Sequence, residues 1–119
     1  MTTRIHGISS MATRQVLAEL AGAYRQRSGV DVAFESVGGV DAAKRVQAGE
    51  SYDLAVLDAD ALDKLTATGR VVAGSQTGLV RSGVAIAVRE DSARPDVSTE
   101  DALKRAVLAA RTLGHSTGP

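Results

Sequence analysis

The sequence contains no cysteine and very few aromatic residues. The absence of cysteine excludes disulfide bonds, thiolate metal sites and a cysteine nucleophile, while leaving the redox compartment open. Aromatic residues make up 3% of the 119 residues, so a core has to be built from valine, leucine, isoleucine and alanine. No segment approaches the roughly 20 consecutive apolar residues that a membrane-crossing helix needs, so we expect no direct membrane insertion.

The chain also lacks a net charge, because fourteen basic and fourteen acidic residues cancel. A neutral balance gives no long-range field toward a polyanion, so we expect no nucleic-acid partner. Residues 1–7 lack the apolar run of a secretory signal, which predicts a cytoplasmic protein as the sequence is written. The location would be periplasmic if a signal peptide had been removed.

The segment from residue 5 to residue 13 predicts a short buried strand that leads directly into a helix. Ser9 or Ser10 is placed to cap that helix, since serine is among the residues most often found at an N-cap. The N–H groups of a first helical turn have no partners within the helix, and the helix dipole is positive there. The turn therefore fits two interpretations, a plain helix cap or a site where Ser9 and Ser10 bind a small anion.

Apolar residues spaced three and four apart predict a helix over residues 11–27, and Gly29 follows in a position suited to end it. A second strand is expected over residues 30–36. The glycine pair Gly38 and Gly39 then lets backbone amides approach a ligand, although a plain tight turn fits equally. Their spacing matches neither a phosphate-binding loop nor a dinucleotide fingerprint, so we expect no nucleotide and no cofactor.

A second helix is expected over residues 41–48, and an apolar run over residues 52–58 predicts a strand buried on both faces. Asp58 or Asp60 can cap the short helix that follows. Right-handed crossovers between parallel strands place all strand ends at one edge, which is where open α/β sheets bind ligands. The sequence thus predicts an α/β fold whose candidate site includes Asp58 beside the serine and glycine turns.

The pattern changes after residue 69, where a long β-rich stretch includes 71–73, 79–80 and 84–88. It predicts a crossover out of the first sheet. Ser98 or Thr99 can cap a helix over 100–109, and a further strand is expected over 111–115.

The order of elements resembles that of the periplasmic molybdate-binding proteins of ABC importers, and more broadly the type 2 periplasmic substrate-binding fold. The residues that carry the resemblance are Ser9 to Met11, Val16–Leu17, Leu20 to Tyr24, Ser28 to Phe34, Val37 to Gly39, Ala42–Ala43, Gln47 to Gly49, Asp53 to Val56, Leu65 and Gly83 to Val88. The resemblance implies a first parallel-sheet lobe over residues 1–80, then a crossover and the beginning of a second, truncated lobe over 81–119. It also implies an oxyanion held by hydroxyls and backbone amides.

Position by position, Ser10 matches the anion-binding serine of that family's first turn, and Ser9 lies beside it. The family's second serine falls at Gly38 or Gly39, which removes a hydroxyl and makes an organic carboxylate an alternative to molybdate. Ser116 and Thr117 are the second-lobe candidates by analogy. Because such proteins are longer than this chain, exposed edges predict a homo-oligomer or pairing with a C-terminal portion.

The leading hypothesis is a binding module for a small anion, with no catalytic residues and an ABC permease as a further partner. The alternative is an isomerase or tautomerase on the same fold acting on a small carboxylate, with His6, His115 and Asp58 as acid or base candidates. A cytosolic effector-sensing domain is a third possibility. Arg14 and Arg81 fit either added charge at the site or solvated surface. No ligand spacing supports a metal site.

Overall fold

The computed structural model describes residues 3–115, which form two compact units. One unit comprises the described residues through Thr77, and the other begins at Gly78. None of the helices in this part of the chain has the length and apolarity that crossing a bilayer requires. The two units are described separately below.

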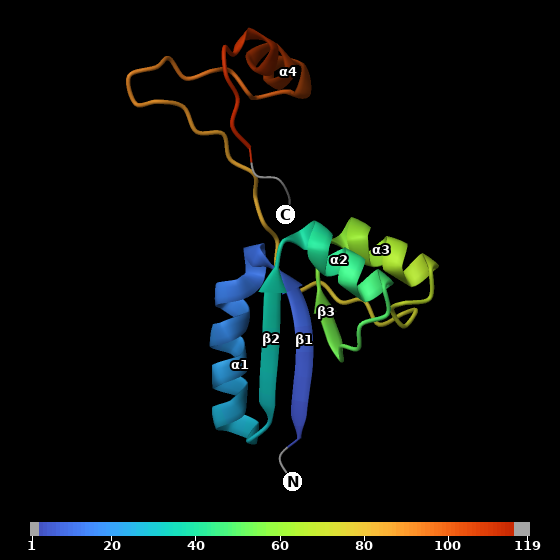
Figure 1. Cartoon of the computed structure of the whole chain (residues 1–119). Helices are drawn as coiled ribbons and strands as arrows, with labels where there is room; N and C mark the ends of the chain where they lie inside the picture. Colours follow the sequence, from blue (N-terminus) through green and yellow to red (C-terminus); the bar gives the residue numbers. More distant parts are fainter. Residues whose placement is uncertain (1–2, 116–119) are drawn as a thin grey trace. The chain divides into compact units, whose positions relative to one another are not determined.

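The first unit is built on a three-stranded parallel sheet in the order β2-β1-β3 (Figure 1). Its strands are β1 (Arg4–Ser10), β2 (Asp31–Val37) and β3 (Leu54–Val56). The first strand in the chain is therefore the central one, and each crossover contains one helix. This arrangement confirms the predicted α/β class with a parallel sheet.

The predicted helix over 11–27 consists of two elements. A 3-10 turn, η1 (Met11–Thr13), precedes α1 (Arg14–Ser28), which packs against β2. Gly29 ends α1 with a φ of 75°, a left-handed conformation that glycine adopts without steric cost. The predicted stop was right, whereas the first turn is a 3-10 turn, as is frequent at helix starts, and neither Ser10 nor Thr13 forms a side-chain cap.

The opposite face of the sheet is covered by α2 (Gly39–Gln47) and α3 (Ala59–Ala67). The buried core on this side consists of Ile8, Ala42, Val46 and Leu65. Burial of the Ile8, Val46 and Leu65 side chains stabilises the fold by roughly 1.5–3 kcal/mol each. This core holds the starts of α2 and α3 at the same end of the sheet as η1 (Figure 1).

The third strand is shorter and more exposed than the sequence predicts. It spans three residues rather than 52–58, and Leu54 is 46% exposed. Leu54 is paired with Gly7 in the sheet, but the helix on that face packs against β2 at the other side of the sheet. The prediction of burial on both faces was therefore wrong for lack of a covering element.

The second unit contains α4 (Glu100–Ala109), capped by Thr99, whose Oγ1 accepts a hydrogen bond from the Ala102 N–H at 3.1 Å. This helix and its cap agree with the prediction. The strands expected over 71–73, 79–80, 84–88 and 111–115 are absent from the described structure, where residues 72–101 are exposed. Backbone N–H and C=O groups form strands only when a neighbouring strand pairs with them, and the sheet of the described residues pairs only β1, β2 and β3.

Candidate functional site

The turns that follow the three strands converge at one edge of the sheet. In the strand register Ser10 is opposite Val37, and Ser9 is opposite Val56. Gly38 directly follows Val37 along the chain, and Asp58 follows Val56 by two residues. The structure therefore brings together the three turns that the sequence singled out.

Ser9 lies at this edge but faces into the protein. Its side chain is fully buried, and its Oγ donates to the carbonyl oxygen of Ser10 at 3.0 Å. Because the Ser9 hydroxyl proton is used in that bond, Ser36 is the donor in the 2.7 Å hydrogen bond between the Ser9 and Ser36 hydroxyls. The ligand role predicted for Ser9 stays a prediction, and it requires this hydroxyl to leave the Ser10 carbonyl.

Ser10 occupies the N-cap position of η1 with extended backbone angles, but its side chain forms no cap hydrogen bond. It is 4% exposed. The prediction that Ser9 or Ser10 caps the helix through its hydroxyl was wrong. The N–H groups of the first turn after Ser10 therefore receive no hydrogen bond from the cap side chain, as the anion-site interpretation requires.

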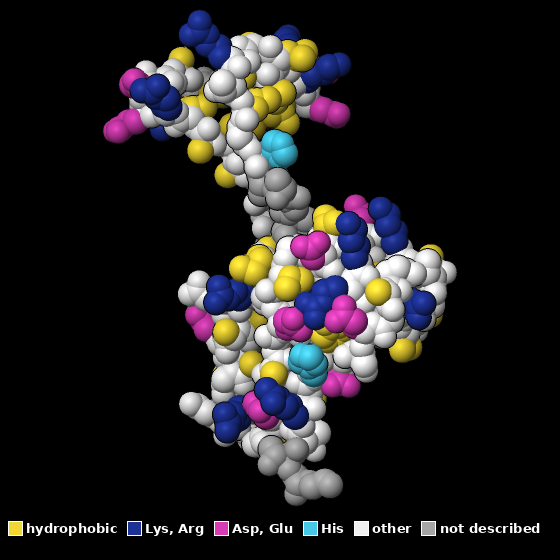
Figure 2. Space-filling view, viewed as in Figure 1, with side chains coloured by type: hydrophobic (Ala, Val, Ile, Leu, Met, Phe, Trp, Pro, Cys, Tyr) yellow, Lys and Arg dark blue, Asp and Glu magenta, His cyan; other side chains and the backbone are white. Residues whose placement is uncertain are grey.

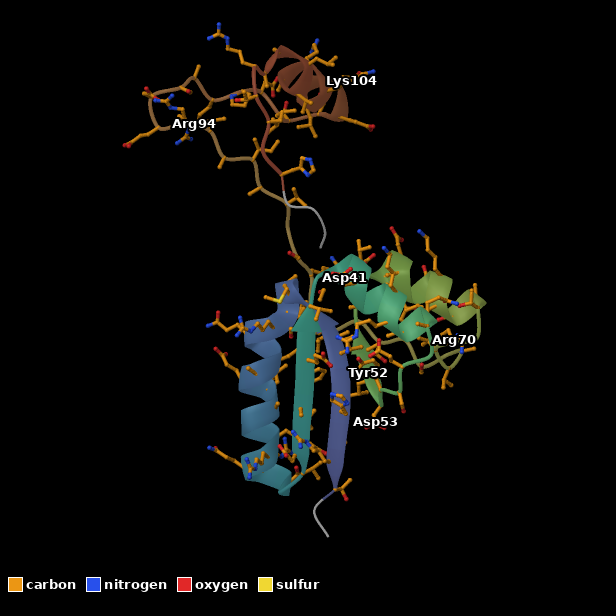
Figure 3. All side chains as sticks on the ribbon, in the orientation of Figure 1. Asp41, Tyr52, Asp53, Arg70, Arg94 and Lys104 are labelled. Atoms are coloured by element: carbon orange, nitrogen blue, oxygen red, sulfur yellow. The ribbon has the colours of Figure 1, made fainter. Side chains whose placement is uncertain are left out.

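The glycine pair begins α2, with Gly38 at the N-cap and Gly39 buried in the first helical position. Gly38 has a φ of −54°, so its backbone conformation does not require glycine. The space beside it is open, because an added β-carbon would meet only the Asp41 carboxylate, at 3.8 Å. Figure 3 shows Asp41 at this end of α2.

Asp58 is the cap of α3, as predicted. Its Oδ2 accepts a hydrogen bond from the Ala61 N–H at 3.1 Å. A hollow of about 440 Å³ lies between α2 and α3, and both Gly39 and Asp58 line it. Its other lining residues are Val40, Ala43, Lys44, Gln47, Asp60, Ala61, Lys64 and Leu65.

The three helix starts at this edge differ in charge. The first turn of α2 contains Asp41, and that of α3 contains Asp60, so an acidic group already matches each positive helix end. The first turn of α1 contains no acidic residue and begins with Arg14. Within the described chain, Arg14 forms no ion pair. The start of α1 is therefore the part of this edge best suited to an added anion.

A charged cluster on the α2 side of the sheet was not predicted. Arg45 donates through Nη1 to Glu35 at 2.7 Å and through Nε and Nη2 to Glu50, at distances of 2.9–3.1 Å. The hydrogen bonds from Arg45 lower the pKa of both carboxyl groups, and the same bonds, accepted by Glu50 and Glu35, raise the pKa of Arg45. The Tyr52 hydroxyl also donates to Glu50. These contacts tie Glu50, in the loop before β3, to Arg45 of α2, and the Arg45 guanidinium is occupied by the two carboxylates.

Of the acid and base candidates of the isomerase hypothesis in the first unit, Asp58 lies at this edge and His6 does not. His6 lies near the middle of β1, about 13 Å from Ser10 at 3.3 Å per residue. The His6 ring contacts that of Tyr52 with a centroid distance of 5.2 Å. The backbone N–H of His6 donates to the Asp53 carboxylate. Figure 3 shows Tyr52 and Asp53 beside β1. His115 and Arg81 belong to the other unit, and Ser116 and Thr117 lie outside the described residues.

The surface of the first unit has no extended patch of one charge sign in the view of Figure 2, where basic and acidic side chains are interspersed. Between residues 3 and 115, no group of three or more histidine, aspartate and glutamate side chains is arranged to hold a metal ion. The local features that the structure offers to a ligand are thus helix-start N–H groups, the Ser10 hydroxyl and Arg14.

A parallel sheet with helix starts gathered at one edge is typical of ligand-binding α/β proteins. The sequence model of the bacterial extracellular solute-binding proteins matches residues 5–119, and the chain belongs to this family. It is also 33% identical to an aconitate isomerase from a Pseudomonas species, over 96% of this chain and 45% of that protein. The chain therefore spans less than half of that relative's length.

Proposed function

We propose that this chain contributes one binding surface of a solute-binding protein, and that its ligand is a small organic carboxylate. The observation that carries the proposal is the start of α1, where no side chain caps the helix and no acidic residue matches its dipole. The ligand carboxylate accepts hydrogen bonds from the N–H groups after Ser10 and gains charge attraction from Arg14.

Two observations favour an organic carboxylate over molybdate. The turn at Gly38 and Gly39 offers backbone and open space in place of a second hydroxyl, which suits an anion with a carbon skeleton. The relative is named for aconitate, a tricarboxylate, and its similarity to this chain includes the candidate edge. An ABC permease is the proposed transport partner, by analogy with other solute-binding proteins.

An isomerase is the second candidate function, and the name of the relative is the observation that favours it. In this chain Asp58 is the candidate base at the edge, once its carboxylate releases the Ala61 N–H. His6 is too far from the edge to share that role directly. Catalysis thus predicts that replacement of Asp58 abolishes turnover, whereas simple binding does not.

A thermal-shift series tests the binding proposal. Tricarballylate, cis-aconitate, citrate, molybdate, sulfate and phosphate are added separately to the wild-type chain, to Ser10→Ala and to the matched control Ser51→Ala. A ligand at a hundred times its Kd stabilises the folded chain by about 2.7 kcal/mol. We expect a carboxylate to raise the Tm of the wild type and the control but not that of Ser10→Ala.

Equal shifts in Ser10→Ala and the control would place the ligand elsewhere, and a shift with molybdate alone would reject the carboxylate class. For the isomerase alternative, proton NMR follows the conversion of cis-aconitate to its trans isomer. Conversion by the wild type that is lost in Asp58→Asn supports catalysis, because asparagine retains the helix cap. Binding without conversion rejects it.

A further inference from the structure

Three serines lie together at the edge of the sheet, although only two of them are neighbours in the sequence. Ser9 and Ser10 end β1, and Ser36 lies opposite Ser9 on β2. The Ser36 hydroxyl donates to the Ser9 hydroxyl at 2.7 Å, and the Ser9 hydroxyl donates to the Ser10 carbonyl oxygen at 3.0 Å. These two hydrogen bonds form a serine network that begins on β2 and ends at the last peptide group of β1.

The serine network fixes the peptide group between Ser10 and Met11. This peptide is trans, so its carbonyl and its N–H point in opposite directions. The carbonyl oxygen is directed toward the hydroxyl of Ser9, which is fully buried. The Met11 N–H is consequently directed away from Ser9, and it is the first of the N–H groups that have no partner within the helix.

The Ser10 side chain lies at the same peptide group but takes no part in the network. Its hydroxyl caps no helix and forms no hydrogen bond with the residues that the structure describes. Those residues alone leave Ser10 only 4% exposed, so only a small group can still reach its hydroxyl. Most buried polar side-chain atoms have a hydrogen-bond partner. The Ser10 hydroxyl and the Met11 N–H therefore offer two donors to one small group such as a carboxylate.

We propose that Ser36 is a positioning residue of the carboxylate site and that it acts through Ser9. The inference rests on the binding function proposed above, and it separates the two adjacent serines by role. Ser10 touches the ligand, whereas Ser9 and Ser36 hold the Ser10 carbonyl oxygen away from it. A carbonyl oxygen turned toward a carboxylate would repel it, so this orientation favours an anion. Connected hydrogen bonds strengthen one another, so loss of Ser36 weakens the bond between Ser9 and the Ser10 carbonyl.

The plain alternative is that the bond between Ser36 and Ser9 only ties β1 to β2. The backbone register already pairs these strands at seven positions. The second bond of the network stays within β1, where it adds nothing to the pairing of the strands. A role in strand pairing alone predicts a lower Tm with an unchanged Kd for the ligand, whereas positioning predicts a higher Kd.

Calorimetric titration with tricarballylate tests the proposal, since this tricarboxylate has no double bond to isomerise. The variants are Ser36→Ala, which removes the donor, and Ser36→Thr, which keeps a hydroxyl at the same position. Thr68→Val is the matched control, because it removes a hydroxyl that donates to Gln47 at 2.8 Å, between the ends of α2 and α3. We expect the Kd to rise about fivefold in Ser36→Ala, as loss of one neutral hydrogen bond predicts, and to stay within about twofold in the other two.

Amide NMR of the same chains supplies a readout that a change in fold stability does not move. In the wild type, tricarballylate is expected to shift the Met11 amide proton downfield, because that N–H gains an anionic acceptor. Ser36→Ala should reduce this shift at saturating ligand, while Ser36→Thr and Thr68→Val retain it. If Ser36→Ala does not fold, Ser36→Cys takes its place, since a thiol fills a similar space and is only a weak donor.

The outcomes separate this inference from the function on which it rests. A wild type that does not bind tricarballylate, cis-aconitate or citrate rejects the binding function and the positioning role together. Binding by the wild type, with the same Kd or the same Met11 shift in Ser36→Ala, rejects the positioning role alone. Weakening by Ser36→Thr as large as that by Ser36→Ala would show that side-chain volume, and not the hydroxyl, sets the affinity, and it also overturns the proposal.

Discussion

The ring of Phe34 lies directly against the backbone of Gly7, its partner on the neighbouring parallel strand. A β-carbon added at Gly7 would lie 2.6 Å from Cδ1 of Phe34, closer than real side chains approach. The absence of a side chain at Gly7 is therefore what allows the largest residue of β2 to cover the central strand.

Gly7→Ala is expected to lower the free energy of unfolding by about 1–3 kcal/mol, because it overpacks this contact. Gly22→Ala is the matched control. Gly22 lies inside α1 with no atom within 4 Å of an added β-carbon, so alanine should raise stability there by about 0.5–1 kcal/mol. Urea unfolding of both variants measures the two effects, and a Gly7→Ala chain as stable as the wild type would contradict the packing argument.

The Arg45 cluster predicts a pH-dependent contribution to stability. The pKa values of Glu35 and Glu50 are lowered from their ordinary 4.5 by hydrogen bonds from Arg45. A lowered folded-state pKa contributes stability above the unfolded pKa, and this contribution is lost as the pH falls through the folded pKa. The stability difference between the wild type and Arg45→Met should therefore be largest above about pH 4.5 and shrink below it.

Unfolding titrations between acidic and neutral pH measure this difference. Arg70→Met is the control, because Arg70 is exposed and forms no ion pair with the described carboxylates. A difference between the wild type and Arg45→Met that stays constant as Glu35 and Glu50 become protonated would show that packing of the arginine, and not its charge, holds the loop.

The role of Asp58 as a cap can be separated from a role in ligand chemistry. Asp58→Ala should lower stability by about 0.5–2 kcal/mol, because the Ala61 N–H loses its acceptor. Asp58→Asn should retain most of that stability, since asparagine caps helices as well as aspartate does. Thermal unfolding without ligand gives the comparison. If Asp58→Asn proved as destabilised as Asp58→Ala, the negative charge rather than the hydrogen bond would be the stabilising feature.

Thr13 carries a buried hydroxyl that has no hydrogen-bond partner within the described structure. Burying an unsatisfied polar group costs about 1–3 kcal/mol, so Thr13→Val, which replaces the hydroxyl with a methyl group, should raise stability by about 1 kcal/mol. Thr66→Val is the opposite case, because the Thr66 hydroxyl donates to the Leu62 carbonyl at 2.8 Å. Its replacement should lower stability by about 0.5 kcal/mol. Denaturant unfolding would reject the argument if the two changes had the same sign.

Much of the first unit could be predicted because its signals are local. Helical spacing, the stop at Gly29 and the cap at Asp58 each depend on residues within one or two turns. The common edge followed from the crossover rule for parallel strands. The prediction of a strand over 84–88 was wrong for the opposite reason. A strand needs a partner, and the sequence of one segment does not specify which partner is present.

The candidate site shows the same division. The positions of Ser10, Gly38 and Asp58 at one edge could be predicted, but the hydrogen-bond partners of the hydroxyls and carboxylates there could not. Ser36 lies opposite Ser9 in the sheet and takes part in its hydrogen bonding, which depends on a register that only the paired strands define. The lack of an acidic residue at the start of α1 was visible in the sequence, and comparison with the acidic starts of α2 and α3 would have revealed it.

The central position of β1 also bears on how the chain acquires its structure during synthesis. The ribosome makes this strand first, yet its two neighbours emerge only after residues 37 and 56. The Asp53 carboxylate accepts a hydrogen bond from the backbone N–H of His6, and it is synthesised 47 residues after that N–H. On the nascent polypeptide β1 can therefore pair with β2 first, and its other side stays open until β3 has left the exit tunnel.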